Sequence, residues 1–332
     1  MASSDLCFET LAAISGLIKT RRISSTEITR IILKRIEMVD GRLHSFARVT
    51  PEAALQAAAN ADTDLAAGIW HGPLHGVPIA VKDLFFTRGI VTAAGMPIRS
   101  AFVPDKDATV VARLKAAGAV LLGKLQMTEG AYGAHHPDIV APLNPWSAAH
   151  WSGSSSSGSG VATAAGMCFG SLGTDTLGSI RFPSTVNGIC GLKPTWGRVS
   201  RAGVFALAQS LDHVGPMTRC VEDAALMLSA IAGPDADDPT ASQRPVPDYL
   251  AGIERGVKGL RIGVDRRLVE RSADEAMISA WEQALKIFAD LGAELCDISI
   301  PELDQVVRDA VQLCGVEAMV AHEATYPACA DK

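Results

Sequence analysis

Lysine and serine side chains in three separate segments carry the groups that could do chemistry in this chain of 332 residues. The first segment ends in Lys82, which follows the apolar run Val77–Val81. A lysine in this place either reaches solvent at a strand end or is buried. Burial lowers the pKa of a lysine, and a neutral lysine can act as a base toward a weak nucleophile such as serine.

The second segment, Trp151–Gly160, is rich in serine and glycine. This composition is typical of flexible linkers. Here, however, Trp151 precedes it and the helix-forming apolar run Val161–Ala165 follows it. A loop of this kind that enters a helix allows close backbone approach and offers several hydroxyl groups. The Gly-Lys-Ser/Thr of a phosphate-binding loop is missing, so a P-loop is excluded.

The third segment is Leu172–Pro183, in which Ser179 directly follows Gly178. Glycines around one serine allow a tight turn whose successive N–H groups point at one spot. That is the geometry an oxyanion hole needs. The alternative for this segment alone is an ordinary turn with a capping serine.

Together, the three segments resemble the amidase signature family of serine amide hydrolases. The resemblance runs from near residue 5 through at least Asp238. It is most specific over Gly153–Pro194, where the serine-rich segment is followed by Gly-Thr-Asp-Thr-x-Gly-Ser-Ile-Arg and then by Gly-Leu-Lys-Pro-Thr. Further family-like stretches are Gly123–Lys124, Gly197–Ser200 and Ser210–Thr218.

The resemblance implies a Ser–Ser–Lys triad for acyl transfer. Its nucleophile would be Ser179, its base Lys82, and its bridging serine Ser155, which the family holds with a cis peptide bond. Neutral Lys82 would accept a proton through Ser155 as Ser179 attacks the amide carbonyl carbon. The same relay would return the proton to the leaving nitrogen, and water would then hydrolyse the acyl-enzyme.

The resemblance also implies roles for residues around the triad. The oxyanion hole would be formed by the backbone N–H groups of Thr176, Leu177, Gly178 and Ser179. Ser156 and Asp175 would hold the relay by hydrogen bonds, and Arg181 would tie the nucleophile loop to its surroundings. A structural ion pair between Asp175 and Arg181 is compatible with these roles.

Two residues depart from the family pattern, since Ser154 and Leu177 stand where glycine is most common. Leu177 would place a side chain beside the oxyanion hole, which would narrow the acyl pocket or require a backbone conformation costly for a branched residue. The C-terminal part is also shorter than usual, so we expect a final helix over 304–323 that lacks packing partners. The pair His135–His136 is expected to be structural or to line the substrate site.

The elements that must position these residues alternate between helices and short apolar strands, which predicts an α/β fold. A capping box at Ser24 and Glu27 marks one helix start. The patterns predict helices over 24–36, 50–67, 109–117, 161–167 and 273–291, and strands over 77–82, 119–122 and 260–264. Residues 169–175 show the pattern of a strand followed by a loop. The resemblance implies an amidase-signature fold with a central mixed β-sheet covered by helices on both faces.

We expect a single amidase domain over 1–332. It would comprise a helical N-terminal part over 1–70, the signature core over 71–232, and a C-terminal part over 233–332. The stretch Gly233–Pro247 is rich in Pro, Asp and Ser and is expected to be a surface loop rather than a linker.

Composition narrows the function classes. Hydrophobic residues make up 48% and charged residues 20%, which supports a large core. A net charge of −6 argues against a broad nucleic-acid surface. No apolar run approaches the ~20 residues that cross a bilayer, and the first residues lack the features of a signal peptide. Seven scattered cysteines without a C-x-x-C pair favour a reduced cytoplasmic enzyme over a disulfide or zinc scaffold. We expect no metal and no cofactor.

The sequence therefore predicts a metal-independent amidase that acts on a small-molecule amide, with a homodimer as one option for its assembly. One alternative is the amidase subunit of a glutamyl-tRNA(Gln) amidotransferase, which would need partner subunits. Others are an ester or carbamate hydrolase with the same triad, and an inactive derivative, motivated by Leu177. The intact set of Lys82, Ser155 and Ser179 argues against the inactive form. Nothing in the sequence selects a particular substrate.

Overall fold

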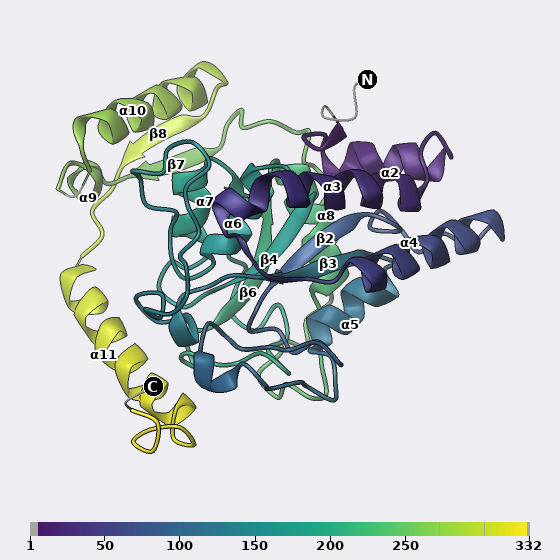
Figure 1. Ribbon diagram of the computed structural model, residues 1–332. Coiled ribbons are helices and arrows are strands. Elements are labelled where there is room, and N and C mark those ends of the chain that lie inside the picture. Colours follow the sequence, from purple (N-terminus) through teal and green to yellow (C-terminus); the bar gives the residue numbers. More distant parts are fainter. Residues whose placement is uncertain (1–5, 272, 302, 331–332) are drawn as a thin grey trace. The chain divides into compact units, whose positions relative to one another are not determined.

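The computed structural model describes residues 6–271, 273–301 and 303–330 (Figure 1). Residues 1–5, which belong to the N-terminal stretch without signal-peptide features, lie outside the described residues. The chain forms two compact units. One comprises residues up to Tyr249 together with those from Leu313 onward, and the other comprises Leu250–Gln312.

A six-stranded mixed β-sheet organises the first unit, with strand order β1-β3-β2-β4-β6-β5. The central strands β3, β2 and β4 are parallel, and the flanking pairs β1–β3, β4–β6 and β5–β6 are antiparallel. The strand bounds are β1 Phe46–Val49, β2 Pro78–Lys82, β3 Val120–Leu125, β4 Gly170–Asp175, β5 Cys190–Gly191 and β6 His213–Thr218. The predicted mixed sheet is confirmed.

Helices cover both faces of this sheet, as neighbouring residues of β4 show. The Ser171 hydroxyl donates to the Ser159 carbonyl of α6, 3.1 Å away. The adjacent Gly170 lies against α8, since a Cβ there would be 2.4 Å from Met227 Sδ. Successive strand residues face opposite sides of a sheet, so α6 and α8 lie on opposite faces.

Two helices of the first unit, α2 and α3, start at a side-chain cap, which Thr10 forms for α2 and Ser24 for α3. In α3, the Ser24 hydroxyl accepts from the Glu27 N–H, and the Glu27 carboxylate accepts from the Ser24 N–H, which is the predicted capping box. The helix bounds are α2 Leu11–Lys19, α3 Ser25–Leu43, α4 Pro51–Ala66, α5 Thr109–Ala116, α6 Ser157–Ala164, α7 Arg181–Asn187 and α8 Val221–Ile231. Short 3₁₀ turns are η1 Pro97–Arg99 and η2 Glu129–Ala131.

Helix α6 differs from its prediction, because it begins at Ser157 within the serine-rich segment rather than at 161. Packing explains the difference. A Cβ at Gly158 would lie 2.4 Å from the Ser45 carbonyl, and one at Gly160 would lie 2.7 Å from Asn187 Nδ2. The glycines therefore let a fully buried helix approach the neighbouring backbone, and this tertiary packing overrides their low helix propensity.

The second unit contains a parallel pair of strands, β7 Arg261–Val264 and β8 Glu294–Asp297, connected through helix α10 Glu275–Asp290. A short helix α9, Arg266–Glu270, follows β7. The last helix, α11 Leu303–Ala321, spans the boundary between the units. Among the described residues, no helix is both long enough and apolar enough to cross a membrane.

The parallel pairing of β2 with β4 brings the ends of both strands to the same edge of the sheet. Lys82 is the last residue of β2, and Thr174 and Asp175 end β4. Sites in open α/β sheets form at such carboxyl ends. The topology thus gathers the lysine segment and the nucleophile segment at one edge.

Candidate active site

Lys82 is completely buried at the end of β2. Its Nζ donates to Ser155 Oγ at 2.6 Å and to Thr174 Oγ1 at 2.9 Å. Burial lowers the pKa of Lys82 to about 7, although the carboxylates of Asp212 and Asp175 act to raise it. About half of the amine is therefore neutral at pH 7, and the Ser155 hydroxyl lies within hydrogen-bond distance of it.

Ser155 is buried and joins the lysine to the start of α6. The peptide bond between Ser154 and Ser155 is cis, as the family resemblance implied for the bridging serine. The Ser155 carbonyl accepts a hydrogen bond from the Thr128 N–H at 3.3 Å. The hydroxyl and the carbonyl of Ser155 are thus each held by a different segment of the chain.

Ser179 lies in the turn between β4 and α7 and is partly exposed. Its carbonyl accepts a hydrogen bond from the Ser156 N–H at 3.3 Å. This bond joins the nucleophile turn to the residue that directly follows Ser155. The structure therefore brings the backbones that carry the two serines together, with Lys82 on the buried side of Ser155.

Ser156 connects the same two segments through its side chain as well. Its hydroxyl donates to the Thr174 carbonyl at 3.2 Å and accepts from the Thr174 N–H at 3.3 Å. Both bonds are buried, so they fix the start of α6 against the end of β4.

The carboxylate of Asp175 organises the turn that carries Ser179, the candidate nucleophile. It accepts from the backbone N–H groups of Gly178 at 2.8 Å and Ile180 at 3.2 Å, and from Arg181 Nε and Nη2, each at 2.9 Å. Burial acts to raise the pKa of Asp175, but the hydrogen bonds and charge of Arg181 hold it below its ordinary value. Asp175 thus stays ionised and ties Arg181 to the turn around Ser179.

A hydrogen bond of the Gly178 N–H removes one donor from the expected oxyanion hole. Because the Gly178 N–H donates to Asp175, it is not a free donor for a substrate oxyanion in this structure, contrary to the expectation. Within the described part of the chain, the N–H groups of Thr176, Leu177 and Ser179 form no hydrogen bond. The side chain of Leu177 is 38% exposed, so it points outward at the surface of the turn.

Two residues beside the triad were not assigned a role from the sequence. Thr174 accepts the second hydrogen bond of Lys82. Asp212 accepts from the Thr176 hydroxyl at 2.5 Å and from the Leu207 N–H at 2.9 Å, and burial raises its pKa. The family-like stretch Ser210–Thr218 was the available signal for Asp212. No sequence signal marked Thr174 as part of the site, because threonine is common in strands.

The histidine pair does not join the triad. His135 Nε2 lies 3.0 Å from the Ser157 hydroxyl, and His136 Nδ1 lies 3.9 Å from an Asp138 carboxylate oxygen. Among the residues that the structure describes, no group of three or more His, Cys, Asp or Glu side chains is arranged to hold a metal ion.

A second buried lysine lies on the neighbouring strand. Lys124 of β3 donates to the Phe85 carbonyl at 2.7 Å and to Thr92 Oγ1 at 2.9 Å, and it lies 3.3 Å from Asp83 Oδ1. Burial lowers the pKa of Lys124 to about 8 and raises the pKa of Asp83. Asp83 directly follows Lys82, so this pair anchors the backbone beside the candidate base.

We predict that Lys124→Met lowers the free energy of unfolding by about 3–5 kcal/mol, because it leaves Asp83 buried without its cation. Guanidinium denaturation followed by circular dichroism measures the change. Lys115→Met is the control, since Lys115 pairs with Asp107 at the surface and should contribute less than about 1 kcal/mol. A Lys124 variant as stable as this control would show that the buried pair does not support the fold.

Comparison with known proteins identifies the fold and the family. The sequence profile of the amidase family matches residues 27–330. The protein named amidase AmiD from Mycobacterium tuberculosis is 52% identical over 322 residues, which is 97% of this chain and 67% of that protein. A glutamyl-tRNA(Gln) amidotransferase subunit from Geobacter sulfurreducens is 46% identical over 311 residues, which is 93% of this chain and 64% of that protein.

The crystal structure of the peptide amidase from Stenotrophomonas maltophilia superposes with a TM-score of 0.86 at 34% identity. The superposition covers 96% of this chain and 67% of the peptide amidase. The chain thus spans about two thirds of the length of these relatives. The expected α/β amidase-signature fold and the family resemblance are confirmed, and the predicted amidase function agrees with the names of the relatives. The chain belongs to the amidase family.

Proposed function

We propose that this chain hydrolyses the carbon–nitrogen bond of a carboxylic amide through an acyl-enzyme on Ser179. The observation that carries the proposal is the buried Lys82 amine, 2.6 Å from the Ser155 hydroxyl, with a pKa of about 7. A serine hydroxyl is a weak nucleophile and needs a base nearby. A lysine with a pKa of about 7 is neutral in about half of the molecules at pH 7 and can be that base, and Ser155 can pass the proton to it.

In the acylation step, Ser179 Oγ forms a bond to the amide carbonyl carbon. Its proton passes to Ser155, and the proton of Ser155 passes to Lys82. The carbonyl oxygen becomes an oxyanion, for which the free N–H groups of Thr176, Leu177 and Ser179 are the proposed donors. Lys82 then returns a proton through Ser155 to the leaving nitrogen, and the carbon–nitrogen bond breaks.

In the deacylation step, a water molecule takes the place of the amine and gives its proton to the same relay. The hydroxide forms a bond to the acyl carbon, the bond to Ser179 Oγ breaks, and Ser179 recovers its proton. Asp175 and Arg181 would keep the nucleophile turn in shape through both steps. Ser156 would keep the two serine segments in register.

The proposal is tested by incubating the purified protein with a panel of primary amides of different size and charge and with the corresponding esters. We expect release of equal amounts of ammonia and carboxylic acid from at least one of them. The identity of 46% to an amidotransferase subunit favours glutamine hydrolysis as a second candidate. Glutamine is therefore included in the panel, and hydrolysis of glutamine alone would favour the second candidate. Release of acid from esters but from no amide would contradict both.

A further inference from the structure

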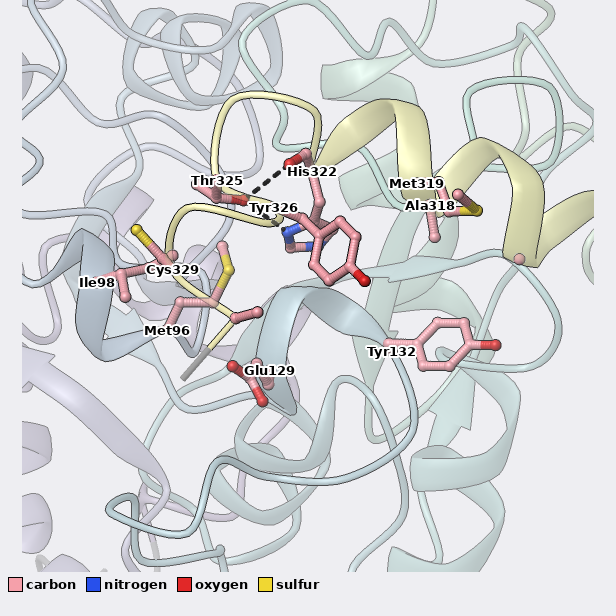
Figure 2. Close-up of a pocket in the computed structure, with 12 residues that line it drawn as sticks. Met96, Ile98, Glu129, Tyr132, Ala318, Met319, His322, Thr325, Tyr326 and Cys329 are labelled. Carbon is pink, nitrogen blue, oxygen red and sulfur yellow. Dashed lines mark hydrogen bonds between the residues drawn. The ribbon is translucent and has the colours of Figure 1, made fainter. Parts of the chain in front are cut away.

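A cleft of about 540 Å³ lies in the first unit (Figure 2). One wall is formed by residues of the 3₁₀ turn Pro97–Arg99 and of the segment Glu129–Tyr132, and the opposite wall by residues between 315 and 330. Lys82, Ser155 and Ser179 are not among the residues that line it. Its volume falls in the range of about 300–1,000 Å³ that is typical of small-molecule sites.

The lining combines apolar surface with a single acidic group. Most side chains are apolar or aromatic, namely Met96, Ile98, Tyr132, Ala318, Met319, Tyr326 and Ala330. Glu129 is the one carboxylate among the lining residues, which include neither lysine nor arginine. Within the described residues, the half-buried Glu129 side chain has no hydrogen-bond or ion-pair partner. The cleft therefore presents an uncompensated negative charge within apolar walls.

The two walls are held together by contacts around His322. A Cβ at Gly130 would lie 2.8 Å from His322 Nε2, so the imidazole packs directly on the backbone that follows Glu129. The His322 ring also meets Phe205 edge-on with 5.6 Å between ring centroids. The Gly130 backbone is itself fixed, because its N–H donates to the Ala94 carbonyl at 2.9 Å. These contacts fix the position of the His322 side chain against the segment that carries Glu129.

We propose that this cleft binds an organic ammonium ion with an apolar or aromatic body. The ammonium group would pair with the Glu129 carboxylate, and the rings of Tyr132 and Tyr326 would add cation–π attraction. The body of the ligand would cover the apolar walls, including Met96 and Met319. Figure 2 shows Glu129 and Tyr132 on one wall and His322 and Tyr326 on the other, so a ligand between them meets both kinds of group.

The cleft is connected to the proposed active site through one residue. Thr128 directly precedes Glu129, and its N–H donates to the Ser155 carbonyl at 3.3 Å. A ligand held by Glu129 would therefore lie next to the segment that positions the bridging serine. The proposed binding does not depend on amide hydrolysis, so it is tested on protein that carries Ser179→Ala.

The experiment measures binding of 3-phenylpropylammonium by isothermal titration calorimetry at low salt. The neutral comparison ligand is 3-phenylpropan-1-ol, which has nearly the same shape. We expect the ammonium to bind at least about tenfold more tightly than the alcohol, because only the ammonium can form a charge-assisted bond with the carboxylate. Equal affinity of the two ligands, or no binding of the ammonium, would overturn the inference.

Variants locate the site. Glu129→Gln should weaken ammonium binding about tenfold or more while leaving the alcohol unchanged. The matched control Glu254→Gln, at an exposed turn of the second unit, should change neither ligand. Met319→Lys at an exposed position of α11 should block the ammonium by charge repulsion without disturbing a packed core. Unchanged ammonium binding in the folded Glu129 and Met319 variants would place the ligand elsewhere and contradict the proposal.

Discussion

Replacing Lys82 with arginine is expected to reduce kcat/KM for amide hydrolysis by at least about 10³-fold, although the positive charge is kept. Arginine is effectively never deprotonated in proteins, so it cannot accept the proton of Ser155. The measurement is steady-state hydrolysis of the best amide of the panel over a range of pH. Lys82→Ala is the companion variant and should fail equally, because it removes the base.

In the parent protein, kcat/KM should rise as pH increases through about 7, the pKa of Lys82 in the folded state, and then level off. The Arg variant should show no such rise. Near-parental activity in the Arg variant would mean that position 82 acts as a fixed charge, and the relay from Ser179 through Ser155 would then be wrong.

Because its pKa is lowered in the folded state, the buried Lys82 decreases the free energy of unfolding at low pH. The folded state binds fewer protons than the unfolded chain between about 7 and the ordinary value of 10.5, so stability rises with pH in that window. Lys82→Met should therefore be at least as stable as the parent near neutral pH. The free energy of unfolding of Lys82→Met minus that of the parent should decrease by about 2.5 kcal/mol between pH 6 and pH 9. An advantage that stays constant across this range would contradict the lowered pKa.

Ser179→Ala is expected to have the largest effect on activity, a loss of at least about 10⁴-fold in kcat, because no acyl-enzyme can form without the hydroxyl. The fold should be intact, since the hydrogen bond between the segments uses the backbone carbonyl of Ser179 and not its side chain. Circular dichroism and thermal melting check the fold. Ser147→Ala, at a partly exposed position away from the segments that carry Lys82, Ser155 and Ser179 in the sequence, is the control and should keep full activity. A Ser179 variant with substantial activity would remove this serine from the mechanism.

Much of the site was predictable because its residues end strands or sit in tight glycine turns. The alternation Val77, Ile79, Val81 placed Lys82 at a strand end, and the structure has β2 ending there. The turn around Ser179 was predicted from Gly178, which adopts a positive φ of 135° that favours glycine. The pairing of Lys82 with the Ser155 hydroxyl was implied only by the family resemblance. The number of residues between two positions in a sequence does not give the distance between their side chains.

What the sequence missed depends on contacts between distant segments. The start of α6 at Ser157 follows from packing against residues far away in the chain, which local propensity does not contain. The use of the Gly178 N–H by Asp175 likewise depends on how the turn folds back on β4. The Asp83–Lys124 pair could not be predicted from the sequence, because the two residues lie far apart in the chain. The parallel pairing of β2 with β3 is what brings their side chains together.

The most direct test of the account is covalent labelling with a fluorophosphonate, read by intact mass and then by peptide mapping. We predict a single adduct on Ser179 in the parent protein. We also predict none in Ser179→Ala, and slower labelling in Ser155→Ala and Lys82→Ala because the relay to the base is broken. An adduct on a different residue, or no adduct on protein that circular dichroism shows to be folded, would contradict the proposed Ser–Ser–Lys chemistry.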